Sequence, residues 1–287
     1  MLIKNFSSRI LVIIGAFCFG MSAVGVLVLV FGIDNLKLMQ SLGMLFQFAL
    51  PVFVCVKLFS EKPFSFLDLQ KTSTKNYLFA SMFAFSAIPA INFFAWINAQ
   101  MKLPKFLAGL ENLIRAAEDE LMRITEQMLA VDTLGGLAVN LVVIALLAAV
   151  CEELFFRGLL QKTLSERINK HAAIWVTALI FSAVHMQFYG FLPRMLLGAA
   201  LGYMVFFSGS LWLPILAHFI NNAVGVIEFY IAKKQNLTFD IENLGAEQSW
   251  YLGLLFLPIC LWFLFLIAKS AKNSLLSLRQ KPQSVEC

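Results

Sequence analysis

Long apolar runs separated by short polar stretches form the pattern along this chain. Eight apolar segments approach the ~20 residues that a helix needs to cross the hydrocarbon core of a bilayer, although the fifth and sixth are short. They cover residues 10–33, 38–59, 77–99, 134–161, 172–188, 192–208, 212–232 and 250–268. A transmembrane barrel would instead show alternating strands of about ten residues. The pattern therefore predicts an all-α polytopic membrane protein with about eight transmembrane helices.

One further segment, residues 104–129, has helical spacing but carries too many charges to cross a membrane. Its apolar residues recur at intervals of three and four, and charged residues occupy the other face. Pro104 suits the first turn of a helix. The net charge is negative, so the segment lacks the basic face that binds anionic lipids. We predict an amphipathic interfacial helix on the outer surface, acting either as a packing element without chemistry or as a gate for substrate.

The composition supports a membrane protein and excludes several other classes. The 287 residues are 60% hydrophobic and 14% charged, whereas soluble domains are about 45–50% apolar and about 25% charged. The net charge of +5 does not indicate nucleic-acid binding, because Lys and Arg lie between apolar runs rather than among exposed aromatic residues. Five cysteines without a pairing rhythm predict neither a disulfide framework nor a Cys-rich zinc site. We therefore expect a lipid bilayer around the chain and no nucleic-acid partner.

The distribution of charged residues predicts the orientation. The first apolar segment follows Lys4 and Arg9, but it is too long for a signal peptide and lacks an Ala-x-Ala-like exit, so we interpret it as a retained anchor. With the N-terminus inside, the inner loops are rich in Lys and Arg and the outer loops are net acidic, as the positive-inside rule requires. We predict a multi-pass protein of the cell membrane with cytoplasmic N- and C-termini. Residues 1–287 then form a single integral membrane domain, and residues 270–287 form a short cytosolic tail.

The fourth apolar segment carries three ionisable residues in the run CEELFFR: Glu152, Glu153 and Arg157. Ionisable groups inside a bilayer are costly, so each needs a partner or a function. Glu153 and Arg157 are four residues apart and can neutralise each other on one helix face, a pairing that also fits a purely structural role. Glu152 is rotated by about 100° and has no local partner. An unpaired carboxyl in apolar surroundings is suited to general acid or base chemistry, which makes Glu152 the candidate base.

Two histidines lie inside the predicted spans. His185 ends the run FSAVH, one turn after Phe181, and His218 shares a helix face with Asn222. A single histidine in a bundle is most often a packing residue, but two of them with Glu152 and an Asn on three spans predict one convergent polar site. Counted from the ends of the predicted spans, the depths of these residues differ by ~10 Å, which helix tilt must absorb. Lys57, Arg194 and Glu228 lie near span ends and are expected to extend to the interface.

These residues form three motifs that resemble those of the CPBP family, the CAAX-prenyl-protease and bacteriocin-processing (Abi-type) intramembrane proteases. EELFFR at 152–157 is similar to that family's EExxxR, FSAVH at 181–185 to its FxxxH, and HFINN at 218–222 to its HxxxN. The resemblance covers about residues 130–232, which we take as the motif-bearing catalytic core. It implies an eight-helix fold and hydrolysis of a peptide bond within the membrane.

The resemblance also implies a role for each motif residue. Glu152 would be the general base, and His185 would help to hold the attacking water. His218 and Asn222 would stabilise the oxyanion, while Glu153 and Arg157 support the motif helix, with Phe181 beside them. The bottom-up chemistry agrees, because amide hydrolysis needs a base, a polarised water and donors for the developing oxyanion.

Two questions stay open at the level of sequence. The glutamate mechanism requires no cofactor, but Glu152, His185 and His218 could alternatively be three ligands of a catalytic Zn²⁺. The sequence has no HExxH, GxSG or GxGD motif of other intramembrane proteases. The leading prediction is an intramembrane endopeptidase acting on a membrane-tethered peptide or protein, with or without an attached lipid. The alternatives are a non-catalytic interaction protein of the same fold, serving immunity or sensor-kinase regulation, and a transporter, which the absence of internal repeats disfavours.

Overall fold

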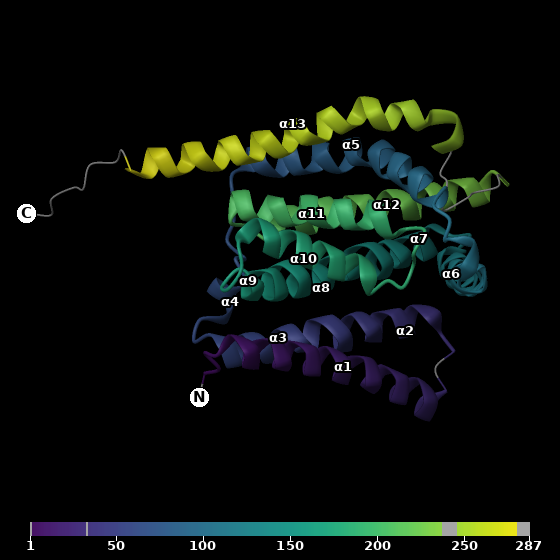
Figure 1. The fold of residues 1–287 in the computed structure, drawn as a ribbon, viewed down its shortest axis with the longest axis horizontal. Coiled ribbons are helices and arrows are strands. Elements are labelled where there is room, and N and C mark those ends of the chain that lie inside the picture. Colours follow the sequence, from purple (N-terminus) through teal and green to yellow (C-terminus); the bar gives the residue numbers. More distant parts are fainter. Residues whose placement is uncertain (1, 33, 237–245, 280–287) are drawn as a thin grey trace, which may run out of the picture.

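The computed structural model describes residues 2–32, 34–236 and 246–279, and every regular element within these ranges is a helix (Figure 1). The all-α prediction is therefore confirmed for this part of the chain. The helices are α1 (Phe6–Phe31), α2 (Leu36–Gly43), η1 (Met44–Ala49), α3 (Leu50–Phe59), α4 (Pro63–Phe66), α5 (Thr74–Ala99), η2 (Lys105–Leu107), α6 (Ala108–Leu129), α7 (Leu134–Asn140), η3 (Leu141–Leu147), α8 (Ala148–Glu153), η4 (Leu154–Gln161), α9 (Lys162–Leu164), α10 (Lys170–Ala183), α11 (Phe191–Ser208), α12 (Trp212–Lys234) and α13 (Ala246–Arg279).

Seven helices among the described residues are long and apolar enough to cross a membrane. They are 6–31, 36–59, 74–99, 134–164, 191–208, 212–234 and 251–271. The chain is thus a polytopic membrane protein, but the count differs from the eight segments that the sequence predicts. The expected fifth segment, 172–188, is helical only as α10, whose 14 residues extend ~21 Å and fall short of a ~30 Å hydrocarbon core. The chain turns away after Ala183, and this turn carries His185.

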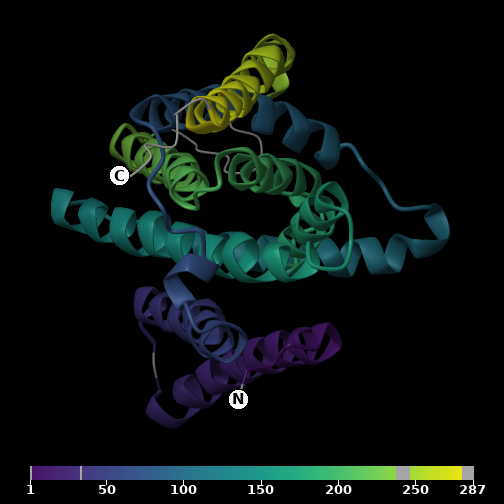
Figure 2. The same ribbon diagram turned by 90° about the vertical axis from the view of Figure 1, so that its left-hand side faces the viewer.

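The helices pack in layers that run alongside one another (Figures 1 and 2). Helices α1 to α3 form one outer layer, and α5 with α13 form the opposite one. Between them lie the long helix from α7 to α9, the short α10, and the pair α11 and α12. Helix α12 packs against α5 and against the η3 and α8 parts of the long helix, and so brings residues of three separate segments together.

The helix predicted over residues 104–129 is present as the short 3-10 turn η2 followed by α6. Figure 1 views α6 almost along its axis while the spanning helices run across the picture, so α6 lies crosswise at one end of the bundle. Its position on the outer face of the membrane stays a prediction. At the other terminus, α13 continues to Arg279, and residues 280–287 of the predicted tail lie outside the described residues.

The long helix from Leu134 to Leu164 contains two π-helical stretches, η3 and η4, on either side of α8. The wider π turn changes the direction in which successive side chains project, and such turns are frequent at functional sites. In this chain they flank the turn that carries Glu152 and Glu153. The motif residues 152–157 thus lie across the boundary between α8 and the π-helical η4.

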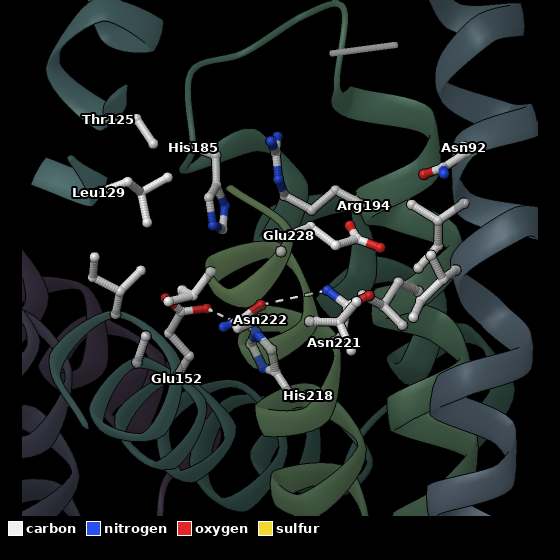
Figure 3. Close-up of a pocket in the computed structure, with 18 of the residues that line it drawn as sticks. Asn92, Thr125, Leu129, Glu152, His185, Arg194, His218, Asn221, Asn222 and Glu228 are labelled. Atoms are coloured by element: carbon white, nitrogen blue, oxygen red, sulfur yellow. Dashed lines mark hydrogen bonds and ion pairs between the residues drawn. The ribbon is translucent and has the colours of Figure 1, made fainter. Parts of the chain in front are cut away.

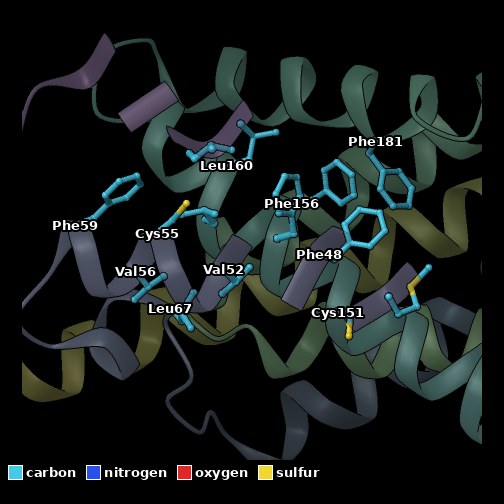
Figure 4. Close-up of a cluster of buried hydrophobic side chains, with 14 of the residues drawn as sticks. Phe48, Val52, Cys55, Val56, Phe59, Leu67, Cys151, Phe156, Leu160 and Phe181 are labelled. Atoms are coloured by element: carbon cyan, nitrogen blue, oxygen red, sulfur yellow. The ribbon is translucent and has the colours of Figure 1, made fainter. Parts of the chain in front are cut away.

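A cluster of buried aromatic side chains fixes η4 against its neighbours (Figure 4). Phe48 of η1 packs against Phe155 and Phe156 of η4, with ring centroids 5.6 and 5.7 Å apart. Phe156 makes an edge contact with Phe181 of α10, at 5.1 Å. Phe181 is 2% exposed, so its ring belongs to this apolar core. The same ring also borders the polar site.

Candidate active site

A cavity of about 410 Å³ lies between the helices, and Glu152, His185, His218 and Asn222 all line it (Figure 3). Glu152 comes from α8, His185 from the turn after α10, and His218 and Asn222 from α12. The structure therefore brings together the four side chains that the sequence placed at one polar site. Further residues of α12 line the cavity, together with residues of α5, α6 and α11.

Glu153 and Arg157 form the predicted ion pair. Arg157 Nη1 donates to Glu153 Oε1 at 2.7 Å, and both side chains are fully buried. Arg157 Nη2 donates to the carbonyl of Gly198 in α11 at 2.9 Å. A Cβ atom at position 198 would lie 3.3 Å from this guanidinium and 3.1 Å from the Phe181 ring, so glycine permits the close approach. The pair thus joins the motif helix to α11.

Glu153 also contacts His218, a relationship that the sequence did not predict. Nδ1 of His218 lies 2.8 Å from Glu153 Oε1. The Glu153 carboxylate pairs with Arg157 and can only accept hydrogen bonds. Nδ1 of His218 therefore carries the hydrogen and donates it to Glu153. This contact fixes the ring orientation and turns Nε2 toward Glu152. Glu153 is therefore a positioning residue for His218 as well as the partner of Arg157.

Glu152 lines the cavity opposite His218. Its side chain is 8% exposed, and Oε2 has no hydrogen-bond partner among the described residues. His218 Nε2 lies 3.9 Å from Oε2, too far for a direct hydrogen bond. One water molecule or one substrate oxygen can bridge a gap of this kind. The carboxylate is therefore positioned to act on a small group that enters between it and His218.

His185 has a defined tautomer because of its position after α10. Its Nδ1 lies 2.8 Å from the carbonyl of Phe181, one helical turn earlier. A carbonyl only accepts, so Nδ1 carries the hydrogen, and Nε2 of the neutral ring is left as an acceptor. The Phe181 ring makes edge contacts with both histidines, at 5.2 Å to His185 and 5.9 Å to His218. Phe181 thus separates the two imidazoles and supports each of them.

Asn222 follows His218 by one helical turn. Asn221 Nδ2 donates to Asn222 Oδ1 at 3.4 Å. Figure 3 shows the amide nitrogen of Asn222 on the opposite side, turned toward Glu152. Asn222 can therefore present an N–H donor to the region beside Glu152, and Nε2 of His218 becomes a second donor when the ring carries a hydrogen on both nitrogens.

The structure corrects the prediction for two residues that were expected to extend to the interface. Arg194 and Glu228 both line the cavity. Arg194 Nη2 donates to Gln187 Oε1 at 2.6 Å, within the turn that carries His185. An ionisable residue within the membrane needs a partner or a function. This rule could have identified both residues as candidate cavity residues, but they were assigned to the ends of predicted spans.

The zinc alternative is not supported by the arrangement of side chains. Among the described residues, no three His, Cys, Asp or Glu side chains are grouped closely enough to hold a metal ion. Glu152, His185 and His218 share a cavity without forming such a set. We therefore derive no step through a metal.

Comparison with known proteins gives a family match over the same region. Residues 134–224 match the family described as type II CAAX prenyl endopeptidase Rce1-like. A curated relative, the uncharacterized protein YpbD of Bacillus subtilis (strain 168), is 34% identical over 89 residues, which are 30% of this chain and 43% of that protein. No solved structure matches the chain significantly. The matched segment contains all three motifs, so the similarity to this family covers the part of the chain that carries Glu152, His185, His218 and Asn222.

Proposed function

We propose that this protein is an intramembrane endopeptidase that hydrolyses a peptide bond of a membrane-associated substrate. The observation that carries the proposal is the unpartnered Oε2 of Glu152, which faces His218 Nε2 across 3.9 Å at a cavity also lined by His185. A buried carboxylate with an open acceptor site, beside two oriented imidazoles, is suited to binding and deprotonating a water molecule.

In the first step Glu152 and His185 hold the water. Glu152 Oε2 accepts one hydrogen, and His185 Nε2 accepts the other, because the Phe181 carbonyl keeps the His185 hydrogen on Nδ1. Glu152 then removes the proton while the water oxygen forms a bond to the carbonyl carbon of the substrate. This step gives a tetrahedral intermediate with a negative oxygen.

In the second step the negative oxygen is stabilised and the amide bond breaks. When the His218 ring is protonated on both nitrogens, Nδ1–H donates to Glu153 and Nε2–H can donate to the oxyanion. The Nδ2–H group of Asn222 is the second donor. Glu152 donates its proton to the leaving amine nitrogen and the C–N bond breaks, which gives an amine and a carboxylic acid that retains the second hydrogen of the water. Glu152 is then a carboxylate again, and the product acid loses its proton to solvent.

The location of the cavity and the family description support a proposed class of substrate. Because the cavity lies within a bundle of membrane-spanning helices, we propose a peptide or protein that reaches it from the bilayer. The prenyl endopeptidases named in the family description make a prenylated peptide the first substrate to test. We also propose that both termini face the cytoplasm, which reporter fusions at each end would test.

The test is the variant Glu152→Gln, which keeps the side-chain volume and removes the base. Purified protein in liposomes is assayed on a fluorogenic farnesylated peptide and on the same peptide without the lipid. We expect a loss of about 10²–10⁴-fold in kcat for Glu152→Gln. The matched control, Glu126→Gln, changes an exposed carboxylate of α6 and should leave kcat unchanged.

Two further experiments distinguish the proposed mechanism from the zinc enzyme and from the non-catalytic interaction protein. Activity that survives exhaustive treatment with EDTA supports direct action of Glu152, whereas loss of activity with recovery on adding Zn²⁺ would assign the metal alternative. A cellular phenotype that Glu152→Gln retains in full would favour the non-catalytic interaction protein and overturn the proposed function.

A further inference from the structure

The turn that carries His185 is irregular and short. It runs from Val184 to Gly190, between α10 and α11. Met186, the residue after His185, has φ = 56°, a left-handed conformation that a side chain of this size rarely adopts. Such a conformation persists only where surrounding contacts hold it. The position of His185 therefore depends on what fastens this turn.

The buried carboxylate of Glu118, in α6, holds this turn through hydrogen bonds. Glu118 Oε1 accepts the backbone N–H groups of Phe188 and Tyr189, and Oε2 lies 3.3 Å from the N–H of Tyr189. Glu118 is 4% exposed although the sequence pattern puts it on the charged face of an amphipathic helix. A carboxylate this deeply buried needs hydrogen-bond donors, and the two backbone amides supply them.

Glu118 is central to how α6 is attached. Only Glu118 and Leu129 are buried in this 22-residue helix. Several apolar residues of α6 and η2 remain exposed, with Phe106 at 83% and Leu113 at 70%. Apolar burial against the bundle therefore contributes little in the middle of α6, and polar contacts to the turn after His185 hold it there.

Further contacts surround the same turn. Tyr189 Oη donates to Glu111 Oε1 at 3.1 Å, and the Arg115 guanidinium lies 4.0 Å from the centre of the Tyr189 ring. From α5, the buried Asn98 donates to the carbonyl of Phe188 at 3.0 Å and accepts the N–H of Leu192 at 2.7 Å. Arg194 holds Gln187 from the α11 side. Three helices thus fix a turn of seven residues.

We propose that α6 is a latch for the active-site turn and that Glu118 is a positioning residue for His185. Glu118 holds the backbone of Phe188 and Tyr189, which fixes the path of the chain back to His185 and keeps its Nε2 directed into the cavity. The effect of this position on hydrolysis rests on the proposed function, whereas the attachment of the turn to α6 does not.

The test uses Glu118→Ala, Glu118→Gln and the matched control Glu120→Ala. Glu120 is an exposed carboxylate of the same helix, and it forms an ion pair with Arg123. Glu118→Gln keeps one acceptor oxygen and should preserve part of the attachment. Hydrogen exchange of the amides at 186–190 should accelerate about tenfold or more in Glu118→Ala, less in Glu118→Gln, and remain unchanged in Glu120→Ala.

A second measurement follows the imidazole itself and needs no turnover. The rate at which diethyl pyrocarbonate modifies His185, determined by mass spectrometry, should rise several-fold in Glu118→Ala only. In an active preparation, kcat should fall about 10- to 100-fold while KM changes little, because the reacting water and not the bound substrate loses its position.

The outcomes separate the two proposals. Unchanged exchange at 186–190 in Glu118→Ala would overturn the latch. If exchange becomes faster but the reactivity of His185 or kcat is unchanged, α6 does hold the turn. Glu118 is then not a positioning residue for His185. A wild-type protein that cleaves no peptide contradicts the proposed function alone, since exchange and His185 modification still decide on the latch.

Discussion

The buried carboxylate of Glu153 accepts a hydrogen bond from Nδ1 of His218 at 2.8 Å, across 65 positions of sequence. Because Arg157 donates to the same oxygen at 2.7 Å, one carboxylate joins the motif helix to α12 and balances a buried guanidinium. Glu153 therefore determines both the stability of the motif helix and the direction in which His218 Nε2 points.

Removal of Arg157 should destabilise the protein strongly. Arg157→Met leaves the fully buried Glu153 without its cation, and we expect a loss of about 3–5 kcal/mol in the free energy of unfolding. The double variant Glu153→Gln with Arg157→Met removes both charges and should recover part of this loss. Thermal unfolding of the detergent-solubilised variants measures the effect. Equal unfolding temperatures for Arg157→Met and wild type would contradict the importance of the pair.

Removal of Asn222 should affect turnover more than binding. In the proposed mechanism its amide donates to the oxyanion, so Asn222→Ala should lower kcat about 10²–10³-fold with a small change in KM. Asn92→Ala is the matched control, because it deletes a carboxamide that lines the same cavity from α5. Steady-state kinetics on the cleaved peptide measure both variants. A similar loss of kcat in the two variants would assign the effect to disturbance of the cavity rather than to oxyanion stabilisation.

The attachment of α6 should weaken only in acid. The hydrogen bond from Arg115 lowers the pKa of the Glu111 carboxyl below its ordinary value of 4.5, with smaller contributions from the N–H of Leu103 and the hydroxyl of Tyr189. A group with a lowered pKa stabilises the fold above its ordinary pKa, and this stabilisation is lost as the pH falls through the lowered value. Burial raises the pKa of Tyr189, and so does its bond to Glu111, so the phenol stays neutral across this range.

Hydrogen exchange of residues 108–116 between pH 7 and pH 3.5, corrected for intrinsic rates, measures this dependence. Exchange should remain slow down to the ordinary pKa of glutamate and accelerate below it. Glu111→Gln should remove the part of the acceleration that depends on Glu111. Acceleration that begins well above pH 4.5 would contradict the lowered pKa.

Several features of the fold follow from the sequence because they depend on local periodicity and on transfer to lipid. Seven long apolar helices and the amphipathic α6 were predictable from segment length and spacing. The Glu153–Arg157 pair was predictable because residues four apart share a face of any helix. The predicted fifth segment is shorter in the structure than in the sequence, because the backbone turns after Ala183 and the helix α10 ends there.

The candidate site was predictable as a set of residues but not as a geometry. Glu152, His185, His218 and Asn222 could be selected because polar groups are costly inside an apolar bundle. Sequence alone gave no sign that His218 bonds to Glu153, that Arg194 lines the cavity, or that Glu118 leaves the solvent face of α6 to hold the turn after His185. Hydropathy fixes which segments enter the membrane, because transfer from water depends on each side chain separately. Which buried polar groups meet depends on how the helices pack, since a donor and an acceptor far apart in sequence become partners only when the tertiary fold sets their distance.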